Sequence, residues 1–275
     1  MTDEPKVVSY TVENRIAWLK FDRPEKRNCM SPTLNRQMLK ALEELEFRDD
    51  VGVVVLTGEG TAWSAGMDLK EYFRENEAKG LWATRKAQRE AYLWWERLRW
   101  YEKPTVAMIN GWCFGGAYGP LFSCDLAFCA DDAQFGLSEI NWGILPGGGA
   151  SKVAAELLNF RDAMYHAMMG ENLVGPEAAK RGLVNESHPG DKLKDRVTEV
   201  CNVLLGKNPT ALRATKWAVR RVREMTYQNA EEYLIRAQEA ANSFDAEGRK
   251  EATRQFIDDK TFKPGLGAYD LDKTR

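Results

Sequence analysis

Two glycine-bearing segments each follow an apolar run and precede residues that can begin a helix. They are Ser64–Leu69 (SAGMDL) and Asn110–Gly119 (NGWCFGGAYG). Glycine lets the backbone come close to a ligand, and free N–H groups at the beginning of a helix attract negative charge. Two such loops could direct a pair of N–H donors at one oxygen atom, which is what an oxyanion hole requires.

A third segment, Phe135–Gly149 (FGLSEINWGILPGGG), places an acid among apolar residues directly after a predicted strand. This acid is Glu139. Burial disfavours an ionised carboxylate and raises its pKa, which suits a group that exchanges protons near neutral pH. The alternative is a structural role in which Glu139 pairs with an arginine. Taken alone, the residue leaves both interpretations open.

Other common chemistries find little support. The chain has two histidines, His166 in a predicted helix and His188 before a proline. This number disfavours a zinc site and limits a Ser-His-Asp triad to one of them, and we expect neither histidine to be catalytic. Gly58–Gly60 follows a strand, but Trp63 stands where a dinucleotide-binding loop needs its third glycine, and no P-loop sequence occurs.

The composition is that of a globular protein: 275 residues, 44% of them hydrophobic and 29% charged. Lys and Arg (39) nearly balance Asp and Glu (41), which argues against a nucleic-acid-binding protein but allows a local basic contact with a phosphorylated ligand. No apolar run reaches the roughly 18 residues of a membrane span. The polar N-terminus does not resemble an export signal, and five cysteines fit a reduced chain, so we expect a cytoplasmic protein.

The elements that must position these segments alternate between strands and helices up to about Gly147. Lys6–Val12 and Ile16–Phe21 are expected to pair as strands, and Ser31-Pro32 begins a helix with serine as its N-cap. The apolar run Val51–Thr57 predicts a strand covered on both faces. Further predicted elements are a helix capped by Asp68, an aromatic-rich helix over Trp82–Trp100, and strands at Thr105–Asn110, Asp125–Ala130 and Gln134–Leu137. We expect the aromatic residues of that helix to be buried or to face another subunit rather than to form a ligand box.

Helices dominate after Gly147. The predicted ones are Ala150–Leu158, Arg161–Met169, Pro176–Arg181, Lys192–Leu205, Pro209–Met225, Glu231–Ser243 and Ala246–Ile257. Because no Pro/Gly/Ser-rich linker separates the halves, we expect a strand-and-helix core over residues 1–200 and a helical C-terminal region over 201–275. The tail Lys263–Arg275 is expected to lie over a surface.

These segments, in this order, resemble the crotonase (enoyl-CoA hydratase/isomerase) superfamily from about Val7 to Gly265. Arg23–Asn28 (RPEKRN), the two glycine-bearing loops and the Glu139 segment carry the resemblance. Within the superfamily, several stretches are similar to the hydroxycinnamoyl-CoA (feruloyl-CoA) hydratase-lyases. These stretches are Trp63–Glu75 (WSAGMDLKEYFRE), Asn110–Gly116 (NGWCFGG) and Phe135–Ile144 (FGLSEINWGI).

The resemblance implies an α/β fold, a crotonase-like spiral of ββα turns followed by a C-terminal helical trimerisation region, assembled as a homotrimer or a dimer of trimers. It implies an acyl-CoA thioester substrate whose carbonyl oxygen accepts hydrogen bonds from the N–H groups of Met67 and Gly116, with Glu139 as acid and base. It implies no metal, no cofactor beyond the coenzyme A of the substrate, and no nucleic-acid or membrane partner. The substrate-binding residues that it implies are Lys26, Ala65, Gly66, Asp68, Leu69, Lys70, Tyr72, Ala117, Tyr118, Gly119, Ser138, Trp142, Gly147 and Ile235.

The implied reaction begins with the addition of water to the β-carbon of feruloyl-CoA, which places negative charge on the thioester oxygen. Glu139 would deprotonate the water and return a proton to the α-carbon. The hydroxy thioester would then break its Cα–Cβ bond in a retro-aldol step and give vanillin and acetyl-CoA. One carboxylate and one oxyanion hole would serve both steps.

Two positions depart from the pattern of the resembling families. Gly119 stands where hydratases of the superfamily carry a second glutamate, which agrees with a lyase-type site. Ile235 stands where the hydratase-lyases carry a tyrosine that reaches the substrate phenol from a neighbouring subunit, whereas Tyr72, the other expected phenol contact, is present. Tyr227 and Tyr233 are alternatives for that contact.

Two other functions stay open at this point. The first is an enoyl-CoA hydratase or isomerase that acts on another acyl-CoA, which the isoleucine at position 235 suggests. The second is a catalytically silent CoA-binding or assembly protein, against which the acid Glu139 and both glycine-bearing loops stand. RNA binding is disfavoured by the balanced charge.

Overall fold

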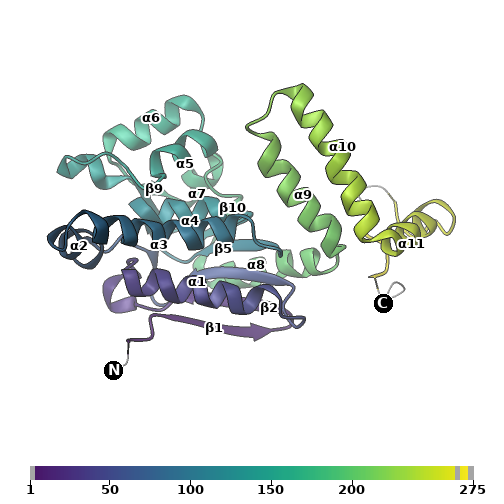
Figure 1. Cartoon of the computed structure of the whole chain (residues 1–275), viewed down its shortest axis with the longest axis horizontal. Helices are drawn as coiled ribbons and strands as arrows, with labels where there is room; N and C mark the ends of the chain where they lie inside the picture. The colour runs from purple at the N-terminus through teal and green to yellow at the C-terminus, as the bar shows by residue number, and fades with distance from the viewer. Residues whose placement is uncertain (1–3, 264–266, 272–275) are drawn as a thin grey trace. The chain divides into compact units, whose positions relative to one another are not determined.

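The structure is a computed structural model that describes residues 4–263 and 267–271 (Figure 1). It divides into two units, Met1–Tyr101 with Thr105–Thr198, and Glu102–Pro104 with Glu199–Arg275. The assignment of residues 201–275 to oligomerisation stays a prediction. Residues 264–266 and 272–275, which belong to the tail expected to lie over a surface, fall outside the described residues.

The larger sheet of the first unit has six strands in the order β1-β2-β3-β5-β7-β10. β1 and β2 pair in antiparallel fashion, as the sequence predicts, and the turn between them holds Asn14 and Arg15 at positive φ. The remaining neighbours are parallel. The six strands are β1 (Val8–Glu13), β2 (Ile16–Phe21), β3 (Val53–Gly58), β5 (Thr105–Ile109), β7 (Leu126–Ala130) and β10 (Glu186–His188).

The smaller sheet has four strands in the order β4-β6-β8-β9. They are β4 (Ala62–Ser64), β6 (Trp112–Phe114), β8 (Gln134–Gly136) and β9 (Leu173–Val174). Each of β3, β5 and β7 is followed in the chain by a strand of this second sheet and then by helical structure. The chain therefore repeats a ββα turn three times and alternates between the sheets at each turn, which confirms the predicted spiral.

Helix α1 (Pro32–Glu46) begins as the sequence predicts. The Oγ of Ser31 accepts a hydrogen bond from the N–H of Leu34 at 3.2 Å, and proline occupies the first helical position. Helix α3 (Leu81–Arg99) packs on α1, and the indole N–H of Trp94 donates to Asn35 at 2.9 Å. Burial of the aromatic residues of α3 is confirmed for Trp94 and Trp95, whereas Trp82 is 79% exposed.

The other helices of the first unit include one unusual element. Residues Leu69–Arg74 form a π-helix (η2), with a bond from the N–H of Glu75 to the carbonyl of Lys70. The remaining helices are α2 (Glu75–Ala78), α4 (Tyr118–Ser123), α5 (Ala150–Leu157), α6 (Phe160–Met169), α7 (Gly175–Lys180) and α8 (Gly190–Leu205), whose last residues belong to the second unit. Short 3-10 helices are η1 (Pro24–Lys26), η3 (Gly115–Ala117) and η4 (Ser138–Trp142).

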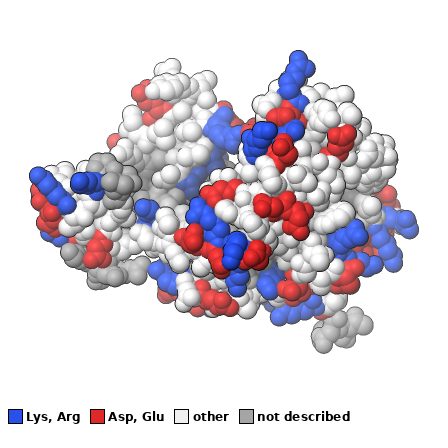
Figure 2. Space-filling view, turned by 180° about the vertical axis from the view of Figure 1, so that it is seen from behind, with Lys and Arg blue, Asp and Glu red and all other residues white. Residues whose placement is uncertain are grey.

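The second unit is built from α9 (Pro209–Val222), α10 (Tyr227–Phe244) and α11 (Ala246–Ile257). Helices α9 and α10 lie side by side (Figure 1), and no residue of either helix is buried in the described part of the single chain. Within that part of the chain, no helix is both long and apolar enough to cross a membrane. On the face drawn in Figure 2, basic and acidic side chains lie interspersed, as the balanced net charge leads one to expect.

Candidate active site

A cavity of about 750 Å³ lies in the first unit, between the loop after β4, the helices η2 and α3, and the beginnings of η3 and η4. Its walls are mainly apolar and aromatic, which is typical of a pocket for an organic ligand. The lining residues are Ala65, Gly66, Met67, Leu69, Tyr72, Phe73, Arg74, Glu77, Gln88, Tyr92, Trp95, Phe114, Gly115, Gly116, Ser138, Glu139, Trp142, Ile144, Leu145, Gly147 and Gly148.

The N–H group of Met67 points away from the β-bridge that Met67 forms with Met30. The carbonyl of Gly66 accepts from the N–H of Met30 at 2.7 Å, and the N–H of Asp68 donates to the carbonyl of Met30 at 3.0 Å. Because backbone groups alternate in direction along an extended chain, the N–H of Met67 points to the opposite side. Met67 also lines the cavity.

The second N–H group belongs to Gly116, in the first turn of the helical segment η3 and α4, where N–H groups have no partner within the helix. The two loops are in direct contact. A Cβ placed on Gly116 would lie 2.7 Å from Cγ and 3.4 Å from the backbone N of Met67. Gly66, at φ +88°, leaves no room for a Cβ either, since it would lie 2.5 Å from the carbonyl oxygen of Phe114. The two loops that carry these N–H groups therefore meet in one corner of the cavity.

Glu139 lies on η4 beside this corner. A Cβ on Gly115, which has φ +49°, would lie 2.6 Å from Oε1 of Glu139, so the carboxylate packs directly on the backbone that precedes Gly116. The Oε2 atom is buried and has no hydrogen-bond partner among the described residues. Burial raises the pKa of this carboxyl group above its usual value. The structural alternative, a pair with an arginine, is not observed in the part of the chain that the structure describes.

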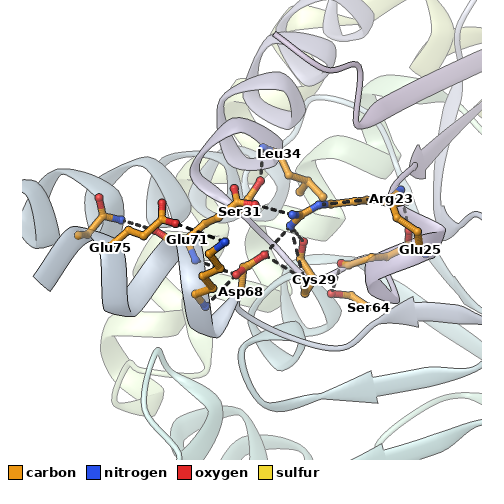
Figure 3. A network of polar contacts seen from close by, with 12 residues as sticks. Arg23, Glu25, Cys29, Ser31, Leu34, Ser64, Asp68, Glu71 and Glu75 are labelled. Carbon is orange, nitrogen blue, oxygen red and sulfur yellow. Dashed lines mark hydrogen bonds and ion pairs between the residues drawn. The ribbon is translucent and has the colours of Figure 1, made fainter. Parts of the chain in front are cut away.

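Ion pairs of Arg23 with Asp68 and Glu71 fix the loop that carries Met67 (Figure 3). Nη1 of Arg23 donates to Oδ2 of Asp68 at 2.6 Å, and Nη2 donates to Oε1 of Glu71 at 2.6 Å. Oδ1 of Asp68 accepts from the backbone N–H groups of Lys70 and Glu71 at 2.9 and 2.8 Å and so caps the π-helix. These contacts outweigh burial and lower the pKa of Asp68.

Many of the residues expected at the substrate line the cavity. They are Ala65, Gly66, Met67, Leu69, Tyr72, Gly116, Ser138, Glu139, Trp142 and Gly147. Tyr72 is nearly buried, and this burial raises the pKa of its hydroxyl group. The glycine-bearing loops and the Glu139 segment thus converge as the sequence predicts.

Other expected residues do not line the cavity. Asp68 is occupied by Arg23 and the helix N-terminus, Lys26 and Lys70 are exposed, and Ala117 is fully buried. Gly119 is buried against Trp95, and Ile235 lies in the second unit, where it is 51% exposed.

Tyr118 also lies outside the cavity wall. Its hydroxyl group is 2.7 Å from Nε2 of His166, and both side chains are buried. Burial lowers the pKa of His166 to about 4, so this histidine is neutral at pH 7 and shares a hydrogen bond with the tyrosine hydroxyl group. The pair links α4 to α6, and neither side chain lines the cavity.

The sequence analysis missed several lining residues, among them Phe73, Tyr92 and Trp95. Tyr92 and Trp95 are one helical turn apart on α3, and their rings pack edge to face at 5.4 Å. Their spacing was the available signal, but the same spacing is typical of core residues. Within residues 4–263 and 267–271, no cluster of three or more His, Cys, Asp or Glu side chains could hold a metal ion.

The spiral fold and the paired N–H groups beside a buried acid define a protein of the crotonase class. An enoyl-CoA hydratase from Bacillus anthracis has the same fold, with a TM-score of 0.84 and 25% identity over 92% of this chain and 97% of that chain. Residues 11–264 match the family model described as enoyl-CoA hydratase/isomerase, and the chain belongs to this family.

Two sequence relatives are named for hydroxycinnamoyl-CoA and for 4-chlorobenzoyl coenzyme A. The chain is 52% identical to the hydroxycinnamoyl-CoA hydratase-lyase of Pseudomonas fluorescens over 96% of each chain. It is 35% identical to the 4-chlorobenzoyl coenzyme A dehalogenase-2 of an Arthrobacter species, over 69% of this chain and 68% of that protein. The predicted resemblance, first to the superfamily and then to the hydratase-lyases, is confirmed.

Proposed function

We propose that this protein is a hydroxycinnamoyl-CoA hydratase-lyase that converts feruloyl-CoA and water to vanillin and acetyl-CoA. The observation that carries the proposal is a buried carboxylate oxygen of Glu139 that has no hydrogen-bond partner among the described residues and lies beside two glycine-bearing loops in an aromatic cavity. The identity of 52% to an enzyme of that name supports the choice within the family.

Hydration uses the N–H groups of Met67 and Gly116 and the carboxylate of Glu139. The thioester oxygen accepts both hydrogen bonds, and the carboxylate takes a proton from water as the water oxygen bonds to the β-carbon. The electron pair of the double bond moves onto the thioester as an enolate, where the fixed N–H groups stabilise the negative charge. Protonated Glu139 then gives its proton to the α-carbon, which completes the β-hydroxy thioester.

In the cleavage step, Glu139 again moves a proton from an oxygen atom to the α-carbon. The carboxylate takes the proton of the β-hydroxyl group, the C–O bond becomes the aldehyde carbonyl, and the Cα–Cβ bond breaks. Its electron pair forms the enolate of acetyl-CoA, which the same two N–H groups hold until Glu139 protonates the α-carbon. Because burial raises the pKa of Glu139, its protonated form is a weaker acid and its ionised form a stronger base than an exposed glutamate.

The remaining site residues receive roles by the same proposal. Tyr72, which lines the cavity, is placed at the substrate phenol, and Lys26, with Lys70, at the phosphates of coenzyme A. No metal and no cofactor beyond the coenzyme A of the substrate takes part in this scheme. The cytoplasmic location expected from the sequence stays a prediction.

The scheme includes self-association as a homotrimer or a dimer of trimers. Helices α9 and α10 bury no residue within the single chain, yet they carry apolar side chains such as Val219, Leu234 and Ile235 that are 59%, 42% and 51% exposed. Burial of such side chains against a second copy would stabilise the assembly. Ile235 is then the residue that a neighbouring subunit would bring toward the acyl group.

The test is incubation of the purified protein with feruloyl-CoA and chromatographic measurement of vanillin and acetyl-CoA. We expect both products in equal amounts, and loss of turnover in Glu139→Gln with CoA binding retained. Glu43→Gln, at an exposed acid of α1, is the matched control and should keep full activity. Absence of any aldehyde from the wild-type reaction would refute the lyase proposal.

A second candidate is a hydratase that stops at the β-hydroxy thioester. The observation that favours it is Ile235, which cannot donate a hydrogen bond to a phenol as the expected tyrosine would. The same experiment separates the candidates, since accumulation of the β-hydroxy thioester without vanillin identifies the hydratase.

A further inference from the structure

Trp95 stands at the boundary between the core and the cavity. The residue is 4% exposed, yet it contributes to the cavity wall from the C-terminal half of α3. The mechanism proposed above assigns it no role. A buried tryptophan beside a reaction centre contributes a large rigid surface with defined geometry.

The ring of Trp95 rests on the backbone of α4. A Cβ on Gly119 would lie 2.7, 2.8 and 2.9 Å from Cε3, Cζ3 and Cδ2 of the indole. Gly119 is three residues after Gly116, about one helical turn from the N–H group assigned to the oxyanion hole. The indole therefore occupies the space that any side chain at position 119 would need.

Neighbouring rings fix the orientation of Trp95. Trp94 packs against it at 6.0 Å and 76°, and Tyr92 at 5.4 Å and 75°, both edge to face. On the far side, a Cβ on Gly148 would touch Cη2 at 3.9 Å, which is ordinary contact. The indole is thus held between two glycines and two aromatic rings and cannot turn out of the wall without disturbing them.

We propose that Trp95 is a specificity-determining residue that packs against the aromatic ring of the acyl group, and that Gly119 is required to make room for it. The inference rests on the proposed function, since it names the wall that selects aromatic over aliphatic thioesters. Two aromatic rings attract each other beyond the area that they bury, whereas an aliphatic chain gains only from burial. A fixed indole loses little freedom when the substrate binds.

The experiment measures dissociation constants by calorimetry for two unreactive thioesters, 3-(4-hydroxyphenyl)propanoyl-CoA and butanoyl-CoA. In Trp95→Leu we expect the dissociation constant of the aromatic thioester to rise about tenfold, in line with the loss of one aromatic contact. The dissociation constant of butanoyl-CoA should stay within about twofold. Trp82→Leu is the matched control, because Trp82 is on the same helix, is 79% exposed and does not line the cavity.

Two further variants protect the test against misfolding. Trp95→Phe keeps an aromatic ring and should restore most of the preference for the aromatic thioester. Gly119→Ala keeps the tryptophan but forces its ring to move, and should weaken binding of the aromatic thioester selectively.

An equal loss for both thioesters in Trp95→Leu and Gly119→Ala, or no loss for either, would overturn the inference. The proposed function is judged separately, by the formation of vanillin in the wild type. If vanillin forms and the ratio of the two dissociation constants does not change in the variants, only the role of Trp95 fails. If no vanillin forms, the hydratase-lyase assignment fails whatever the binding ratio.

Discussion

Replacement of Arg23 by methionine tests whether the network behind Met67 holds the site in place. Arg23 and Asp68 have side chains that are 9% and 8% exposed, and their ion pair of 2.6 Å is reinforced by a second pair to Glu71 (Figure 3). Methionine has a similar length but no charge and no N–H donor. The substitution therefore leaves the carboxylate of Asp68 buried without its cation.

The expected loss of stability depends on the hydrogen bonds that Asp68 retains in the variant. Removal of one partner from a buried ion pair costs about 3–5 kcal/mol. Asp68 retains two backbone N–H donors at 2.9 and 2.8 Å, which favours the lower end, about 3 kcal/mol. At about 2–4 °C per kcal/mol for a chain of this size, the unfolding temperature should fall by about 6–12 °C. The displaced loop should also lower kcat, because the Met67 N–H group loses its position.

The assay is thermal unfolding at pH 7 and one fixed protein concentration, together with steady-state kinetics. Addition of Asp68→Asn to Arg23→Met should recover part of the lost stability, since the amide oxygen can still cap the π-helix and no charge is stranded. The loss caused by Arg23→Met should also shrink as the pH falls through the lowered pKa of Asp68, because protonation removes the buried charge.

Arg48→Met is the control, since the pair of Arg48 with Asp50 lies at the surface, where ion pairs contribute little. A loss below about 1 kcal/mol in Arg23→Met, or no recovery in the double variant, would refute the reasoning.

Four further predictions concern the acid, the oxyanion loop and a helix cap. Burial raises the pKa of Glu139, so ionisation of this group destabilises the folded state above pH 4.5. Glu139→Gln should therefore unfold at a higher temperature than the wild type at pH 7. In a thermal-unfolding series, this difference should vanish well below pH 4.5. The wild-type kcat/KM should fall as the pH drops through the same raised pKa, as a pH–rate profile will show. Gly66→Ala would place a Cβ 2.5 Å from the carbonyl of Phe114, and kcat should drop about 10²- to 10³-fold in single-turnover kinetics, as for loss of an oxyanion donor. Ser31→Ala removes the cap of Leu34 and should cost about 1 kcal/mol in urea unfolding without a change in kcat.

The elements that could be predicted from the sequence depend on local signals. Ser31 caps α1 because the hydroxyl group reaches an N–H three residues ahead, whatever the rest of the chain does. The cap of Asp68 was predicted for the same reason. The π-helix that follows was not predicted, and its residue Glu71 pairs with the distant Arg23, a contact that no local pattern indicates. Local residue types therefore predict where this helix begins but not the i→i+5 hydrogen bonding that it adopts.

The residues of the site also differ in whether the local sequence predicts them. Glu139, Met67 and Gly116 could be proposed because glycines and an acid among apolar residues are unusual wherever they occur. Trp95 and Tyr92 could not, because aromatic residues at helical spacing predict a buried face equally well. Which of them meets the cavity depends on the packing of α3 against a glycine more than twenty positions later in the chain.

Gly119 belongs to a short segment whose glycines leave room for the side chains of the site. Gly115 leaves space for the carboxylate of Glu139, Gly116 for the side chain of Met67, and Gly119 for the indole of Trp95. Glu139, the N–H group of Met67 and Trp95 thus all pack against residues 115–119. Alanine at each glycine of this segment should disturb a different property of the enzyme. At Gly115 it displaces the acid and should lower kcat at all pH values. At Gly119 it displaces the wall and should change substrate preference while proton transfer continues. A single shared defect in both variants would mean that the stretch acts only as a rigid scaffold.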